Sequence, residues 1–376
     1  MRPLALVALV VRATALVVLA TALAAPAAGA QSIEDGAQRA GEPSWGDYVR
    51  PGRRVARQLR RDGLVRLLDA LERDDATAQA PEVLYEQALI RFERARRTLD
   101  DDPDLLYFRA VALSGWHADL DGDGADEHRT EEAIDAFEDL RRVAPEYHPD
   151  RVAFSLALLH ARRSALREAI TEYERVIAST IGPSSPLHYG VADRERALAA
   201  LFTPQPLATA YLNMAEALML LGEPESLARA VESYRRASEL GAGDPFDRAT
   251  ALWGLAVALD RAGDHREAIS AAQRAIDADP VPDDVARLGI DHQAHGPMAI
   301  LHSTLVFFEP AHEVHAYDAL GWEALARRAG RDADRRELLE RAVRAWREHL
   351  TGGGNAGAYA DHARRAVERI EQELRR

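Results

Sequence analysis

Lysine and cysteine are both absent from this sequence of 376 residues. Without cysteine the chain forms no disulfide, thiolate nucleophile, zinc–thiolate site, covalent haem link or cysteine lipid anchor. Without lysine all 47 basic residues are arginine, and 61 acidic residues give a formal net charge of -14. Such an acidic chain lacks the clustered cations that nucleic acid requires, so no nucleic-acid partner is expected. Aromatic residues make up only 6%. Alanine, leucine, glutamate and arginine are abundant and favour helices.

The first 30 residues have the composition of an export signal. Arg2 and Arg12 flank a short apolar stretch, an uncharged run follows, and Ala28 and Ala30 give the small-residue pattern of a cleavage site. The sequence therefore predicts a secretory signal peptide over residues 1–30, cut after Ala30. The mature chain is expected to be exported, periplasmic or extracellular, with no stable membrane insertion. The alternative is a retained membrane anchor, but the uncharged run is shorter than the roughly 20 residues that a bilayer span needs.

Beyond a polar lead-in, one spacing recurs along the chain. An alanine is followed four residues later by an aromatic residue, and in most copies a proline closes the unit twelve or fifteen residues after the alanine. The alanine supplies a small surface where two helices meet, and the aromatic residue fills the gap to the next pair. The five copies are Ala88/Phe92, Ala133/Phe137, Ala169/Tyr173, Ala230/Tyr234 and Ala268, which has Ala272 in place of the aromatic residue.

These segments resemble the second helix of the tetratricopeptide-repeat (TPR) family, and the residues before them resemble its first helix. Small residues at Ala157, Ala215 and Ala256 stand where the first helix meets the second. The resemblance covers about residues 83–281. It implies an all-α, TPR-like α-solenoid of stacked antiparallel helix hairpins, because no hairpin buries its apolar face alone.

The expected organisation follows from these boundaries. Later segments echo a first helix around Leu320-Gly321 and a second helix around Trp346, and a last helix from Tyr359 to Leu374 is expected to cap the apolar end. The predicted parts are a signal peptide over 1–30, a flexible lead-in over 31–52, a TPR solenoid over 53–281 with clear repeats at about 83–281, and a divergent helical repeat with capping helices over 282–376.

The resemblance also implies where a partner binds. In family members that bind peptides, the first helices line a concave groove, where an aromatic residue and an arginine can anchor a partner. The alternative is that the aromatic residues only pack between repeats and the arginines only keep the surface soluble. The predicted partner-binding groove consists of Phe154, Leu158, Arg162, Leu212, Glu216, Met219, Thr250, Trp253, Val257 and Arg261.

Aspartates at alternate positions, followed by glycine, resemble the calcium loops of the EF-hand, dockerin and thrombospondin type. The closing bidentate glutamate of an EF-hand is missing, because Thr130 stands at its position. The expected role is therefore a structural calcium site, and the alternative is an acidic, solvated loop. The ligands implied by this resemblance are Asp119, Asp121, Asp123, the carbonyl of Ala125, and Asp126 or Glu127.

Five histidines lie between His292 and His315, including the pairs His292-x-x-His295 and His312-x-x-His315. A pair at this spacing on a helix could share a metal, but no third ligand is evident, and surface or packing roles are the alternative.

Motifs for catalysis are lacking. The sequence has no nucleophile elbow, and its one glycine run, Gly352-Gly353-Gly354, lacks the lysine of a phosphate loop. No catalytic residue is predicted, and at most a structural calcium is expected as a cofactor. The predicted function is a non-catalytic, extracytoplasmic TPR scaffold for protein–protein or peptide interaction, in a process such as envelope assembly. The alternative is a metal-dependent protein or enzyme that uses the histidine-rich region after Pro280.

Overall fold

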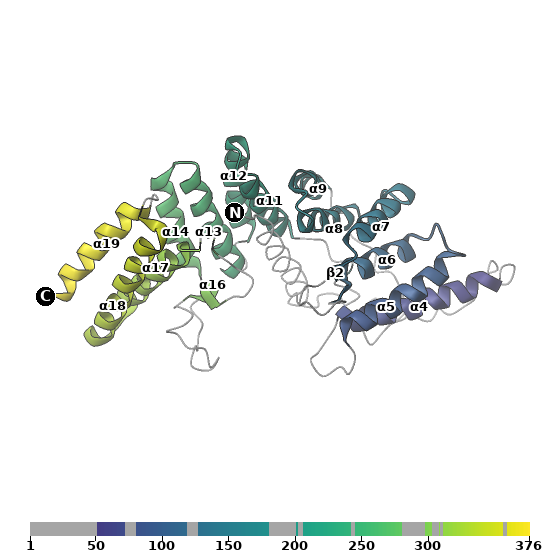
Figure 1. Cartoon of the computed structure of the whole chain (residues 1–376), viewed down its shortest axis with the longest axis horizontal. Coiled ribbons are helices and arrows are strands. Elements are labelled where there is room, and N and C mark those ends of the chain that lie inside the picture. The colour runs from purple at the N-terminus through teal and green to yellow at the C-terminus, as the bar shows by residue number, and fades with distance from the viewer. Residues whose placement is uncertain are drawn as a thin grey trace, which may run out of the picture. The chain divides into compact units, whose positions relative to one another are not determined.

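The computed structural model describes the chain in ten stretches, and Figure 1 shows that these are built almost entirely of helices. The predicted signal peptide and most of the lead-in lie outside the described residues. The chain divides into two compact units, residues 1–205 and 206–376. The described residues are 51–71, 80–118, 127–179, 201, 206–241, 245–279, 298–302, 308, 311–355 and 359–376.

The described residues of unit 1 form a stack of three helix hairpins, α4–α5, α6–α7 and α8–α9. Successive hairpins contact each other through α5 with α6 and α7 with α8. Helices α5, α6 and α8 each begin at a proline, whose fixed φ suits the first turn of a helix. The helices are α4 (Pro51–Leu71), α5 (Pro81–Arg96), α6 (Pro103–Gly115), α7 (Thr130–Val143), α8 (Pro149–Arg162) and α9 (Leu166–Ala178).

The recurring alanine and aromatic residues form the core of unit 1. Ala88 and Phe92 of α5 are fully buried, and the Phe92 ring stacks on Phe108 of α6 with ring centroids 6.4 Å apart. Phe137 of α7 meets Tyr107 of α6 edge-on at 6.3 Å. Phe92 thus fills the gap to the next hairpin, as the spacing predicts, whereas Phe137 packs on the first helix of its own hairpin.

A short β-ladder lies between α6 and α7. Strands β1 (His117–Ala118) and β2 (Glu127–His128) pair antiparallel, with His117 opposite His128 and Ala118 opposite Glu127. The sequence predicts no strand here, because two-residue strands carry no alternating pattern. The ladder brings together the two ends of the aspartate-rich segment, and residues 119–126 of that segment lie outside the described residues.

The described residues of unit 2 form three more hairpins, α11–α12, α13–α14 and α17–α18, followed by α19 against α18. Helix α12 contacts α13, and α14 contacts α17, so the hairpins stack in chain order. The elements are α11 (Leu207–Leu221), α12 (Pro224–Leu240), α13 (Pro245–Arg261), α14 (His265–Ala278), α16 (Ala299–His302), α17 (Glu313–Arg328), α18 (Asp332–His349), the π-helical turn Leu350–Gly354 and α19 (Tyr359–Leu374).

Small residues let the helices of unit 2 approach closely. Ala215 and Ala256 are fully buried at the hairpin contacts. A Cβ added at Gly254 would lie 2.3 Å from the ring of Tyr234, so the aromatic residue of α12 packs directly on the backbone of α13. Gly222 ends α11 with a φ of 67°, a left-handed conformation that suits glycine.

The end of the solenoid is covered as the sequence predicts. Ala363 and Ile370 of α19 are fully buried, and Trp346 of α18 contacts His362 of α19 edge-on. Stacked hairpins with a helical cap confirm the predicted all-α, TPR-like α-solenoid within each unit.

Candidate partner-binding surface

The three predicted groove residues of unit 1 lie on α8. Phe154 is buried and meets Tyr173 of α9 edge-on, with ring centroids 5.9 Å apart. Leu158 and Arg162 are half-buried. Arg162 donates a hydrogen bond from Nη1 to the carbonyl oxygen of Ser114, at 3.2 Å. Two of the three side chains therefore have partners within unit 1.

The other predicted groove residues lie on α11 and α13 of unit 2. Met219 and Val257 are buried, Leu212 is half-buried and Arg261 is exposed. The Thr250 hydroxyl donates to the carbonyl oxygen of Phe246 one turn earlier on α13. The structure thus brings seven of the ten residues together on two neighbouring first helices.

Trp253 packs between repeats. Its ring meets Phe308 at 5.6 Å and Tyr317 of α17 at 4.6 Å, both edge-on, and its side chain is 6% exposed. Tyr317 in turn donates a 2.6 Å hydrogen bond from its hydroxyl to Asp279, which also accepts from the Ile300 backbone at 3.3 Å. The Trp253 ring therefore packs between repeats and is not an exposed anchor for a partner.

Glu216 has a different environment. It is half-buried on α11, and burial alone raises the pKa of its carboxyl group to about 7. Tyr234 lies close enough for the Glu216 charge to help raise the pKa of its hydroxyl, although burial is the larger cause. A nearby cation would stabilise the ionised form of such a buried carboxyl group.

Four further polar residues of unit 2 are not among the predicted site residues. Two of them are buried. Neither amide atom of Asn213 on α11 has a hydrogen-bond partner in the described parts of the chain, and the hydroxyl of Tyr359 on α19 has none there either. Asp260 and Asp318 are half-buried carboxylates on α13 and α17. Asn213 is one turn before Glu216, so the helical stripe through Glu216 could have identified it. The others depend on the packing of α17 and α19, which no local pattern encodes.

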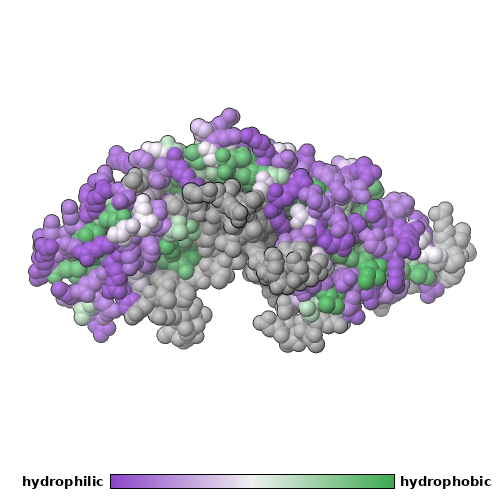
Figure 2. Space-filling view, in the orientation of Figure 1, coloured by the Kyte–Doolittle hydropathy of each residue, from purple (hydrophilic) through white to green (hydrophobic). Residues whose placement is uncertain are grey.

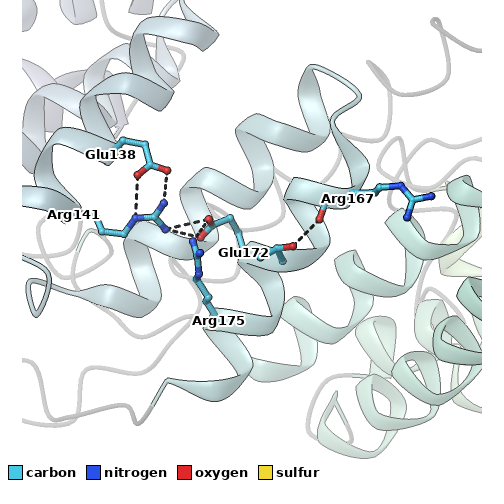
Figure 3. Close-up of polar contacts among 6 residues, drawn as sticks. Glu138, Arg141, Arg167, Glu172 and Arg175 are labelled. Atoms are coloured by element: carbon cyan, nitrogen blue, oxygen red, sulfur yellow. Dashed lines mark hydrogen bonds and ion pairs between the residues drawn. The ribbon is translucent and has the colours of Figure 1, made fainter.

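Unit 1 carries a network of ion pairs that no sequence pattern predicts (Figure 3). Arg141 of α7 reaches both Glu138 on its own helix and Glu172 of α9, the latter at 3.0 Å. Arg175 pairs with the same Glu172, whose side chain is 6% exposed. The network joins two second helices and stabilises their contact.

The predicted metal-binding residues are largely outside the described structure. This holds for Asp119, Asp121, Asp123, Ala125 and Asp126, and for the side chain of Glu127.

In the histidine-rich region, His292 and His295 also lie outside the described residues. His312 and His315 are described, and His349 of α18 directs Nδ1 to the His312 carbonyl oxygen at 3.0 Å. Within the part of the chain that the structure describes, no group of three or more histidine or acidic side chains is placed to hold a metal ion.

Figure 2 shows hydrophilic residues over most of the visible face, with hydrophobic residues gathered in a few patches. Among the described helices, none combines the length and the apolar character that crossing a membrane demands.

Stacked helix hairpins define the class of α-helical solenoid repeat proteins. Residues 206–280 match the tetratricopeptide-repeat family, which places α11 to α14 in the matched region. Residues 206–280 of this chain are therefore tetratricopeptide repeats. The fold suits protein–protein interaction, and members of this family are generally non-catalytic scaffolds.

Several solved structures are similar to parts of the chain. MamA, residues 41 to the end, from Desulfovibrio magneticus RS-1 is 17% identical, with 60% of this chain and 94% of that chain covered and a TM-score of 0.39. The repeats of a putative kinesin light chain from Podospora anserina are 16% identical, covering 63% and 97%, with a TM-score of 0.36. The TPR2AB domain of yeast Sti1, in complex with pHSP90, is 16% identical, covering 84% and 98%, with a TM-score of 0.24. A search of curated proteins finds no significant match.

Proposed function

We propose that this chain is a non-catalytic scaffold outside the cytoplasm that binds an extended protein segment in envelope assembly. The binding surface is the first-helix face of unit 2, defined as the side of α11, α13 and α17 that carries Leu212, Glu216, Val257 and Asp318. The family match over α11 to α14 supports this function, because TPR hairpins present their first helices to partners. The signal-like composition of residues 1–30 supports the location.

Asn213 is the observation that carries the proposal. Its side chain is 4% exposed, and neither amide atom has a hydrogen-bond partner among the described residues. Leaving buried polar atoms unsatisfied costs about 1–3 kcal/mol. The backbone of an extended segment offers both a donor and an acceptor, which are what an amide side chain needs.

Panning a random peptide library against the immobilised full-length protein tests this function. Selected peptides are expected to lose at least about tenfold in affinity for Asn213→Leu, because the variant keeps the bulk and removes both polar atoms. The matched control is Gln273→Leu, on the exposed side of α14. Unchanged affinity of every selected peptide for Asn213→Leu would refute the assigned surface.

The location has its own test. N-terminal sequencing of the protein from the cells that make it is expected to start at Gln31. A cytoplasmic protein that starts at Met1 would contradict export.

The proposal includes a structural calcium between α6 and α7, held by the aspartate-rich segment. Calcium at millimolar concentration is expected to raise the melting temperature of the wild type but not of Asp121→Ala. An equal melting temperature of the wild type with and without calcium would remove the ion from the proposal.

A further inference from the structure

The first helices of unit 2 share an acidic stripe. Each helix has a small residue at its hairpin contact, and positions three before, one after and four after that residue lie on one helix face. Each of α11, α13 and α17 carries a carboxylate at one of these positions. They are Glu216 directly after Ala215, Asp260 four residues after Ala256, and Asp318 three residues before Gly321.

Burial destabilises the charge of all three carboxylates. It is the largest cause that raises the pKa of Glu216 and of Asp318 to about 7, and it raises the pKa of Asp260 as well. At Asp318 the neighbouring charge of Glu348 adds to this effect, and the hydrogen bond from Trp322 only partly offsets it. Within the described residues, the ionised carboxylates therefore lack sufficient counter-charge.

Two buried polar side chains beside the stripe are also unsatisfied. Asn213 lies one turn before Glu216, and both its amide atoms lack partners within the described stretches. Tyr359 is 4% exposed, its hydroxyl has no hydrogen-bond partner there, and the charge of Asp260 contributes to raising its pKa. These groups are not carboxylates, and they independently indicate a ligand that supplies donors and acceptors at the same face.

Among the described residues, the nearby cations only partly offset the raised pKa values of Asp260 and Asp318. His265 brings Nδ1 to 3.3 Å from Asp260, but its side chain is exposed. The charge of Arg261, which is exposed as well, lowers the pKa of Asp260. Arg341 lies over the ring of Trp322 at 5.0 Å, and its charge lowers the pKa of Asp318. Despite these groups, the pKa values of Asp260 and Asp318 remain raised.

We infer that the first-helix face of unit 2 selects a basic protein segment, whose arginine or lysine side chains pair with Glu216, Asp260 and Asp318. This inference rests on the proposed function and names the partner's chemistry. A cation next to a desolvated carboxylate replaces the hydration that burial removed, so complementary charge gives the face its specificity. Asn213 and Tyr359 hydrogen-bond to the same segment.

Two labelled ten-residue probes test the inference on the full-length protein by fluorescence anisotropy. One alternates alanine with lysine and the other alternates alanine with glutamate. The lysine probe is expected to bind about tenfold more tightly, and Glu216→Gln combined with Asp318→Asn is expected to remove most of that difference. The matched control, Glu239→Gln with Glu340→Gln, neutralises exposed carboxylates on the second helices α12 and α18 and is expected to change neither affinity.

Equal binding of the two probes to the wild type would overturn the inference. So would a double variant, Glu216→Gln with Asp318→Asn, that still prefers the lysine probe as strongly as the wild type does. The carboxamides keep the side-chain volume and remove a charge that burial disfavours, so the variant is expected to fold, with a melting temperature at or above that of the wild type. If library peptides bind at Asn213 but carry no excess of arginine or lysine, the proposed function holds and the basic partner is wrong. If no peptide binds this face, both are wrong.

Discussion

In unit 1, the first helices carry arginines that have partners on neighbouring helices. Arg60 of α4 pairs with Asp102 at 2.7 Å, Arg109 of α6 pairs with Glu93 of α5, and Arg162 of α8 donates to the Ser114 carbonyl oxygen. In unit 2, the corresponding helices carry carboxylates with raised pKa values. The same hairpin architecture thus places Arg60 and Arg109, each paired with a carboxylate, on the first helices of unit 1, and incompletely compensated anions on those of unit 2. Arg162 has only a carbonyl partner, and burial lowers the pKa of its guanidinium.

The difference separates stability from binding. A cross-helix ion pair holds two hairpins together, but its charges already pair with each other and do not pair with a ligand. A half-buried carboxylate without sufficient counter-charge lowers the stability of the free protein and gains when a cationic ligand arrives. Unit 1 is therefore expected to lose stability when its charges are removed, and unit 2 to gain it.

The largest effect is expected at Glu172 in unit 1. Glu172→Ala leaves Arg141 half-buried without its partner on α9, and should lower the free energy of unfolding by about 2–4 kcal/mol. Hydrogen exchange in α7 and α9 measures it. The control is Glu174→Ala, an exposed position on the same helix, with an expected change within about 0.5 kcal/mol. Equal protection in the two variants would show that the ion pairs of unit 1 add no stability.

Asp102→Ala is expected to have the next largest effect. The Asp102 carboxylate accepts from the Leu105 backbone at the start of α6, at 3.0 Å, and pairs with Arg60 of α4. Losing the helix cap and a partly exposed ion pair should cost about 1–2 kcal/mol. Asp102→Asn keeps the cap and should recover about half of the loss in hydrogen exchange of α6. If both variants lose the same amount, the cap contributes nothing.

In unit 2 the sign reverses. Glu216→Gln removes a carboxylate that burial penalises, and should raise the stability of α11 by roughly 1 kcal/mol at pH 8. Exchange rates of the α11 amides measure this gain, with Glu239→Gln of α12 as the exposed control. A destabilised Glu216→Gln protein would mean that the Glu216 charge is satisfied inside unit 2, and the contrast between the units would fail.

The smallest effect is the pH dependence of that gain. The folded pKa of Glu216 is about 7, above its ordinary value of 4.5, so ionisation costs stability as pH rises from 4.5 to 7. The advantage of Glu216→Gln should therefore be smaller at pH 5 than at pH 8 and should level off above pH 7. Exchange measured at both pH values and corrected for intrinsic rates tests it. A constant advantage would assign the gain to packing instead of charge.

Much of the fold could be predicted because the spacing of residues within each helix hairpin determines it. The alanine and aromatic pairs mark helix contacts within one hairpin, and the terminal helix has the expected bounds, Tyr359 to Leu374. Two features of the surface could not be predicted. Trp253 contacts Phe308 and Tyr317, which lie far along the chain, and the burial of Asp318 beside Glu348 depends on how α17 packs. Both depend on how a divergent repeat stacks, and spacing within one helix carries no information about that.

The β-ladder between α6 and α7 makes this hairpin a natural place to graft a reporter. Because His117 and His128 are paired, the chain leaves and re-enters the solenoid at adjacent points. An inserted fluorescent domain with neighbouring termini could replace the residues between the strands, since each doubling of loop length costs only about 0.6 kcal/mol of closure entropy. The graft would lie in unit 1 and would leave α11, α13 and α17 unaltered for binding measurements.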